Sequence, residues 1–375
     1  MIHIRPGSQT QALITLLSVV GEFPTRSLHL LGNERVYKAL VHRLTSPETF
    51  RNSLTGEEMT VRLLTVTGKA AGKTVRFYKG ALPILEWVGG KEYYLSAFWN
   101  HKFPGDAAHK ERNHRVAEAV AMCMRAGVAY RPYLLPVLQN REIRSVIPND
   151  PVFYPAKDIK RIGEEEINKT MFTRLTGALY AGGTCYGVYN TRNAVMKWRG
   201  KGEFKAMQHL VDISRLNAGI SCVDSAILFG ESERVALDTL LLSDKMDFRF
   251  DSVYRHVHFI PLNEFGIRLL TLMLASDWNA QLLDLLFDPD TRSYNKGVFE
   301  YDAFVDGVYV LSHLDGDIAR LIRFRDSVHT RSGRFEVLCY PGQVPFLREY
   351  LGAHVSIKTI DIGSVEAELS GNGGE

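Results

Sequence analysis

The alternation of hydrophobic and polar residues in the first hundred positions predicts three helices followed by a β-hairpin. Leucine and valine recur at helical spacing over Gln9–Val20, which gives this segment one apolar face. A short second helix, Arg26–Leu31, ends before Gly32, and glycine favours the end of a helix. Asn33 can cap a third helix that extends to Thr45.

The third helix has two contrasting sides. We expect its inward side to consist of Val36, Ala39, Leu40 and Leu44. The opposite side carries Arg35, Lys38, His42 and Arg43. A helix with a basic outer side is suited to the major groove of DNA.

A basic hairpin follows this helix. Two alternating segments, Met59–Val66 and Thr74–Tyr78, have the pattern of β-strands and are joined by a glycine-rich turn. Lys69, Lys73 and Arg76 lie in or beside the turn, where their side chains can reach phosphates. Helices followed by a basic hairpin predict a winged helix-turn-helix that binds double-stranded DNA.

The chain beyond residue 150 alternates strand-like and helical segments, which predicts an α/β domain and a mixed α+β protein overall. The expected strands are Ala178–Tyr180, Cys185–Tyr189, Ala194–Trp198, Ser225–Phe229, Val257–Ile260, Val308–Leu311, Phe335–Cys339 and Ser356–Ile360. The expected helices are Phe204–Val211, Arg234–Leu241, Glu264–Leu274 and Val344–Tyr350.

An amphipathic helix over Ala107–Ala126 and a group of prolines between positions 132 and 155 separate these two parts. We therefore expect a winged-helix domain at residues 1–100, a connecting helix and proline-rich linker at 101–150, and the α/β domain at 151–375.

Charge is unevenly divided between these parts. The whole chain has a net charge of +3, but residues 1–150 hold 20 Lys and Arg against 12 Asp and Glu, and the remainder holds 25 against 30. Residues 1–150 thus have a net charge of +8 and the remainder a net charge of −5. This division favours contact between the first domain and a polyanion.

Three sequence features exclude other classes of protein. No apolar run approaches the roughly 20 residues that cross a bilayer, and the first residues lack the pattern of a signal peptide. The four cysteines form no C-x-x-C pair, which favours reduced thiols. We expect a cytoplasmic protein without a membrane contact.

A nucleotide site is not expected at the glycine-rich turn. Gly68 falls one position too late for a phosphate-binding loop, and the segment after Lys73 is strand-like where that loop requires a helix. No cofactor is expected elsewhere.

Three other groups could carry chemistry. Glu203 and Lys205 form the E-x-K fragment of a metal-dependent nuclease, but the preceding strands have no acid to complete it; Asp158 and residues 164–166 offer acids further upstream. His256 and His258 point to one side of a strand, with no third ligand at a familiar spacing, so no metal is expected. The aromatic residues Tyr186, Tyr189, Trp198 and Phe204 suit an apolar core better than base stacking, and His101, His109 and His114 are expected at the surface.

Residues from about 10 to 210 resemble the replication-relaxation family of bacterial plasmids and integrative elements. The resemblance is carried by Phe23–Arg43, the hairpin, Arg112–Val116 at the start of the connecting helix, and Gly177–Glu203. It implies a winged helix followed by a domain related to restriction nucleases, in a protein that serves plasmid replication or mobilisation. Tyr189 and Asn190 stand where the family often has two acids, which implies a nuclease-like domain without activity.

The sequence therefore predicts a non-enzymatic DNA-binding accessory protein of a mobile element, acting in replication, mobilisation or their regulation. A relaxase or replication protein is the expected partner, and a homodimer is a further expectation. The alternatives are a metal-dependent nuclease that uses Glu203 and Lys205, and a transcriptional regulator whose C-terminal domain binds a small ligand.

Overall fold

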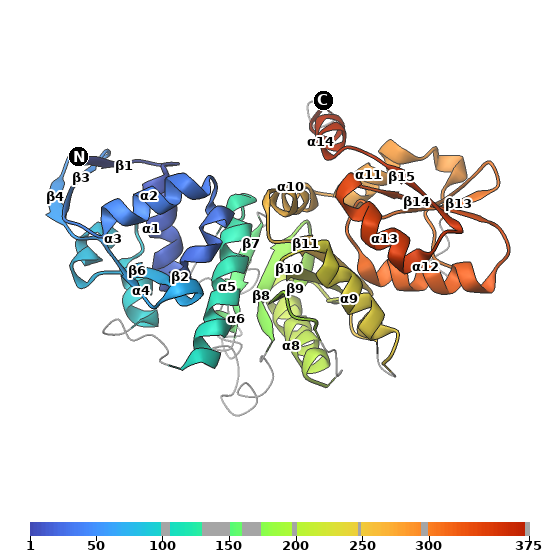
Figure 1. Cartoon of the computed structure of the whole chain (residues 1–375), viewed down its shortest axis with the longest axis horizontal. Helices are drawn as coiled ribbons and strands as arrows, with labels where there is room; N and C mark the ends of the chain where they lie inside the picture. Colours follow the sequence, from blue (N-terminus) through green and yellow to red (C-terminus); the bar gives the residue numbers. More distant parts are fainter. Residues whose placement is uncertain are drawn as a thin grey trace. The chain divides into compact units, whose positions relative to one another are not determined.

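The computed structural model describes residues 1–98, 106–129, 151–159, 174–196, 201–246, 249–293 and 299–371. The chain divides into two compact units, Met1–Arg125 and Ala126–Glu375, both of mixed α/β structure (Figure 1). Helix α5 (Ala107–Arg125) belongs to the first unit. The expected linker over 101–150 therefore contains a helix of the first unit, and its proline-rich portion at 130–150 lies outside the described residues.

The first unit contains helix α1 (Gln9–Val20), a 3-10 helix at Thr25–Leu31 and helix α2 (Glu34–Leu44). The Asn33 side chain accepts hydrogen bonds from the backbone N–H groups of Arg35 and Val36, which starts α2 as expected. Helices α3 (Leu82–Trp87), α4 (Lys91–Ala97) and α5 complete its helical part.

Two small sheets accompany these helices. Strand β2 (Glu22–Pro24) pairs with β6 (Thr74–Phe77), and β6 pairs with β5 (Leu64–Thr67), all antiparallel. Strand β3 (Glu48–Asn52) lies between β1 (Ile2–Ile4) and β4 (Glu58–Val61). The expected strand Met59–Val66 is thus two strands in two sheets, and only its second part forms the hairpin with β6.

The inward side of α2 differs from the expected one. Tyr37, Val41 and Leu44 are buried, whereas Val36 is 41% exposed and Ala39 is exposed as well. The helix has two apolar stripes one residue apart, one with Val36 and one with Tyr37. The stripe that contains the larger Tyr37 side chain is the one that is buried. Only Leu44 was expected correctly as a fully buried residue.

In the second unit, a five-stranded sheet has the order β11-β10-β9-β8-β7. Its strands are β7 (Val152–Pro155), β8 (Leu175–Ala181), β9 (Thr184–Arg192), β10 (Ser225–Gly230) and β11 (His256–Pro261). Strand β8 is antiparallel to both neighbours, and β9, β10 and β11 are parallel. Helices α8 (Lys201–Ala218) and α9 (Glu233–Ser243) make the crossovers that parallel strands require, and the short α6 (Ala156–Ile159) follows β7.

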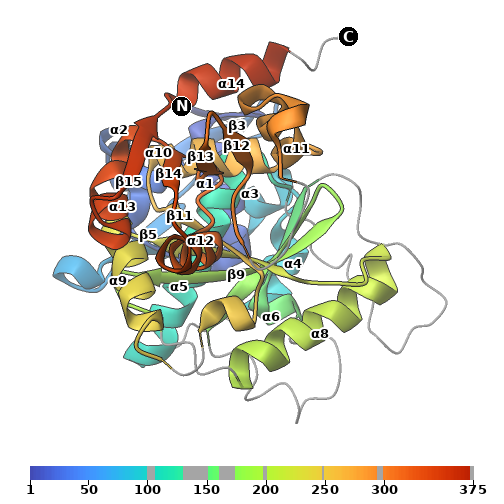
Figure 2. The ribbon, with the colours of Figure 1, turned by 90° about the vertical axis from the view of Figure 1, so that its right-hand side faces the viewer.

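A second sheet of this unit has the order β12-β13-β14-β15. Its strands are β12 (Ala303–Val305), β13 (Val308–Ser312), β14 (Arg334–Cys339) and β15 (Val355–Thr359), with the last three parallel. Helices α12 (Ile318–Thr330) and α13 (Val344–Leu351) connect them. Helices α10 (Glu264–Met273) and α11 (Trp278–Leu286) lead into this sheet, and α14 (Ile362–Gly371) lies beside α11 (Figure 2).

The strand expected over Ala194–Trp198 is not observed in the described residues of that segment. Over Ala194–Trp198 the described residues, 194–196, belong to no strand, and the rest lies outside the described part. Strand β9 ends at Arg192, whose φ of 54° turns the backbone out of the sheet, and the Ala194 N–H bonds the Thr191 carbonyl.

Candidate functional site

Helix α2 exposes a basic stripe. Arg35, Lys38 and His42 recur at helical spacing and are all exposed. Lys38 forms an ion pair of 2.6 Å with Glu34 one turn before it. Arg43 is also at the surface, but Glu48 accepts two hydrogen bonds of 2.8 Å from its guanidinium. Arg35 and His42 are therefore better placed than Arg43 to contact a ligand.

The hairpin between β5 and β6 carries the second group of basic residues. Lys69 and Lys73 are exposed, whereas Arg76 is half-buried and within electrostatic range of Tyr94. The turn is tight: Gly68 has a φ of +85°, and a Cβ there would lie 2.2 Å from the Gly72 carbonyl oxygen. This geometry fixes the two lysines at the tip of a short hairpin.

Lys73 is also tied to the helical part of the unit. Its carbonyl oxygen accepts hydrogen bonds from the Thr25 N–H at 3.0 Å and from the Thr25 hydroxyl at 3.2 Å. Thr25 begins the 3-10 helix that leads to α2. The hairpin tip and the helices are thereby held in one arrangement.

The residues of the nuclease alternative do not converge. Glu203 and Lys205 lie in the first turns of α8, not on a strand. Two positions apart on a helix, they point in different directions, so Glu203 is 7% exposed and Lys205 is at the surface. The Glu203 carboxylate is bound by Arg174 at 3.1 Å, and β8 and β9 contain no acid. Asp158 lies on α6, and residues 164–166 are outside the described part.

The predicted burial of the aromatic residues and the predicted exposure of the histidines are confirmed only in part. Tyr186 and Tyr189 are buried, but Phe204 is 51% exposed, and Trp198 lies outside the described residues. His109 is exposed as expected; His101 is outside the described part.

His114 is buried, against expectation. Its Nε2 lies 3.1 Å from Glu22, and Glu22 is only 2% exposed. The helix packs against β2, and the carboxylate there supplies the partner that a buried imidazole needs.

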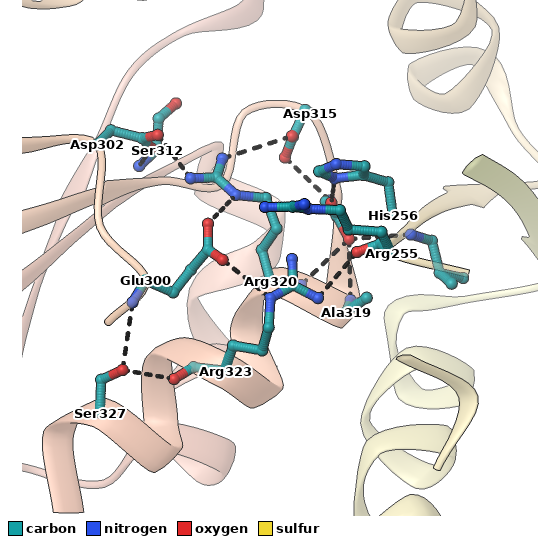
Figure 3. Close-up of polar contacts among 12 residues, drawn as sticks. Arg255, His256, Glu300, Asp302, Ser312, Asp315, Ala319, Arg320, Arg323 and Ser327 are labelled. Carbon is teal, nitrogen blue, oxygen red and sulfur yellow. Dashed lines mark hydrogen bonds and ion pairs between the residues drawn. The ribbon is translucent and has the colours of Figure 1, made fainter. Parts of the chain in front are cut away.

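A dense polar cluster in the second unit was missed by sequence reasoning (Figure 3). It joins the start of β11 to the turn before α12, through a 2.7 Å contact between His256 Nδ1 and the Asp317 carboxylate. Asp317 is fully buried and also accepts hydrogen bonds from the N–H groups of Val257, Ala319 and Arg320, so it caps α12. The sequence signal was available in Asp315-Gly316-Asp317 directly after a strand, but its partner lies about sixty positions earlier in the chain.

Burial and the close spacing of the carboxylates shift the pKa values of several groups in this cluster. Burial lowers the pKa of His256, but the hydrogen bond and charge of Asp317 outweigh it and raise that pKa above its usual range. Burial and the neighbouring charge of Asp317 raise the pKa of Asp315. Arg320 supplies a buried cation, with contacts of 2.7 Å to Glu300 and 2.5 Å to Asp302.

A cavity of about 330 Å³ lies beside the cluster. Its lining includes His256, His258, Asp224, Tyr186 and Trp278, from the amino-terminal ends of the parallel strands and from α11. Because Asp317 occupies Nδ1 of His256, Nε2 is the nitrogen of that ring left for the cavity. The space is large enough for a small organic molecule.

Comparisons with protein-family models, with curated proteins and with solved structures find no significant match for this chain. Among the described helices, none combines the length and the apolarity needed to cross a bilayer.

Proposed function

We propose that the first unit is a winged helix that binds double-stranded DNA. The order α1, β2, 3-10 helix, α2 supports this proposal, as does the pairing of β2 with the later hairpin in one sheet, β2-β6-β5. Strands β3 and β4 of the other sheet lie between α2 and the hairpin in the chain. In such a module the second helix of the pair enters the major groove and the hairpin follows the phosphates.

The main support for the proposal is that hydrogen bonds connect the segments that carry two basic surfaces. The exposed stripe of α2 with Arg35 and the hairpin tip with Lys69 and Lys73 are joined through Thr25. The unit Met1–Arg125 holds 17 Lys and Arg against 10 Asp and Glu, a charge of +7, which favours a polyanionic partner.

The test is a salt titration of binding to specific and random duplexes by fluorescence anisotropy. Lys73→Ala should weaken binding to both duplexes alike and flatten the salt dependence by about one unit of slope. Arg35→Ala should cost roughly 1–3 kcal/mol on the preferred site and less on random DNA. Lys245→Ala, an exposed lysine of the second unit, is the matched control.

Arg43→Ala gives a sharper version of this test. Since Glu48 already holds the Arg43 guanidinium, we expect a smaller loss of affinity than for Arg35→Ala. If neither Arg35→Ala nor Lys73→Ala changes affinity or salt slope, the winged-helix proposal fails.

The cellular role proposed for this binding is that of an accessory protein of a mobile element, in replication, mobilisation or their regulation. It rests on the resemblance to the replication-relaxation family, with a relaxase or replication protein as partner. The acid-free strands β8 and β9 and the separation of Glu203 from Lys205 support a second unit without nuclease activity. Supercoiled DNA should remain intact with Mg²⁺ or Mn²⁺; nicking that Glu203→Ala abolishes would favour the nuclease.

A ligand-responsive transcriptional regulator is the second candidate, and the 330 Å³ cavity of the second unit favours it. In that case a small molecule that raises the melting temperature of the second unit should also change the affinity of the protein for DNA. A ligand that stabilises the protein without altering DNA affinity would count against regulation.

A further inference from the structure

Three ligand groups in the buried cluster of the second unit lie close together. His258, Asp315 and Asp317 each offer one ligand atom, and these atoms are all within 4.8 Å of one another. The three residues are 4%, 3% and 0% exposed. Ligands about 2.0–2.2 Å from a Zn²⁺ ion lie roughly 3.3–3.6 Å apart in a tetrahedral site, so binding would contract the group by about 1 Å.

A backbone contact orients the ring of His258. Its Nδ1 lies 2.9 Å from the Asp315 carbonyl oxygen, which can only accept, so in the neutral ring Nδ1 carries the proton and Nε2 has the free lone pair. Histidine ligands of metal ions ordinarily donate their other N–H to a carbonyl or carboxylate in this way. His258 also lines the cavity, whereas Asp315 and Asp317 are not part of its lining.

The carboxylates are oriented by their own partners. Oδ1 of Asp317 accepts three backbone N–H groups, whereas its Oδ2 has the single contact with His256 at 2.7 Å and retains a lone pair. Oδ1 of Asp315 accepts the Asp317 N–H at 3.0 Å, and its Oδ2 is 3.8 Å from Arg320, beyond hydrogen-bond distance.

Buried negative charge exceeds buried positive charge here. The guanidinium groups of Arg320 and Arg323 contact the carboxylates of Glu300, Asp302 and Asp315 (Figure 3). The carboxylate of Asp317 accepts the backbone N–H of Arg320 and has no guanidinium contact among the described residues. With all four carboxylates ionised and His256 protonated, the cluster has an excess of one negative charge. An uncompensated buried carboxylate is costly, and a divalent cation would compensate it.

His313, in the same turn, provides an independent observation. It is 1% exposed, and its Nδ1 has no hydrogen-bond partner among the described residues. Buried ring nitrogens are nearly always satisfied, so an ion or its water ligand close to Nδ1 would supply the partner that this nitrogen lacks among the described residues.

We propose that His258, Asp315 and Asp317 bind one divalent transition-metal ion between β11 and the turn before α12. A mixed set of one imidazole and two carboxylates suits Zn²⁺, Mn²⁺ or Co²⁺ better than Ca²⁺ or Mg²⁺. His256 and Arg320 are positioning residues that orient the two carboxylates. The site is separate from the DNA-binding surface proposed above and does not depend on it.

The experiment uses the full-length protein, freed of metal with a chelator and then titrated with Co²⁺ and Zn²⁺. We expect one equivalent of Co²⁺ to bind with a visible absorption band, Zn²⁺ to displace it, and bound ion to raise the melting temperature. His258→Asn retains a donor at the position of Nδ1 and removes Nε2, so it should abolish the band while the protein stays folded. Asp315→Asn should weaken binding strongly, and His256→Gln, which changes only the orienting shell, by roughly 10–100-fold.

His354→Ala, which removes an exposed histidine of the same unit, is the matched control and should bind as the wild type does. Folding of each variant is checked by its circular dichroism and melting curve. Absence of a stoichiometric Co²⁺ band in the wild type overturns the proposal and leaves Arg320 as the cluster's own cation. Unchanged binding by a folded His258→Asn protein overturns it as well.

Discussion

The first unit should not fold when the chain is cut at residue 100. Helix α5 packs against α1, β2 and the 3-10 helix, and its residues Val120 and Met122 are 1% and 0% exposed. Burial of each of these two side chains contributes about 1.5–3 kcal/mol. A chain of residues 1–100 loses both contributions.

Two buried hydrogen bonds would be lost with them. His114 contacts Glu22 at 3.1 Å, and the Ser27 hydroxyl donates to Glu118 at 2.6 Å. A hydrogen bond with a charged partner contributes roughly 1.5–3 kcal/mol. The four losses together come to about 6–12 kcal/mol, which is comparable to the whole stability of a small domain, about 5–15 kcal/mol.

The assay is urea unfolding of two shortened chains, residues 1–129 and 1–100, monitored by circular dichroism. We expect a cooperative transition for the longer chain and none for the shorter one. Lys110→Ala in the longer chain replaces an exposed residue of the same helix and should leave the midpoint unchanged. A transition of the 1–100 chain at the urea concentration that unfolds 1–129 would refute the assignment of α5 to this unit.

Two further predictions concern local chemistry. Asn33→Ala removes the side chain that caps α2 and should lower the stability of the 1–129 chain by about 1 kcal/mol in urea, whereas Asn33→Asp, which can still accept the same bonds, should not. Iodoacetamide should label Cys222 in the native protein and spare the three buried cysteines; mass spectrometry of the labelled peptides, with Cys222→Ser as control, tests this. Because partial burial, together with the charge of Asp224, raises the Cys222 pKa above that of an ordinary thiol, the labelling rate should level off at a higher pH than that of free cysteine, and a plateau near neutral pH would contradict the reasoning.

Elements whose signals are local could be predicted from the sequence. The cap at Asn33, the hairpin turn at Gly68 and the strands from Ser225, Val257 and Phe335 all lie where the pattern indicated, because caps, turns and periodicity act over a few residues. The alternation of strands and helices in the second unit was readable for the same reason.

Tertiary packing selected which apolar stripe of α2 is buried, and it placed α5 with the helices before it. It also decided that Glu203 lies on a helix with Arg174 as its partner. The cluster at Asp317 was invisible to periodicity, since His256 reaches it across about sixty residues of chain. Such contacts depend on which faces pack together, and packing is a property of the whole fold that no short stretch of sequence contains.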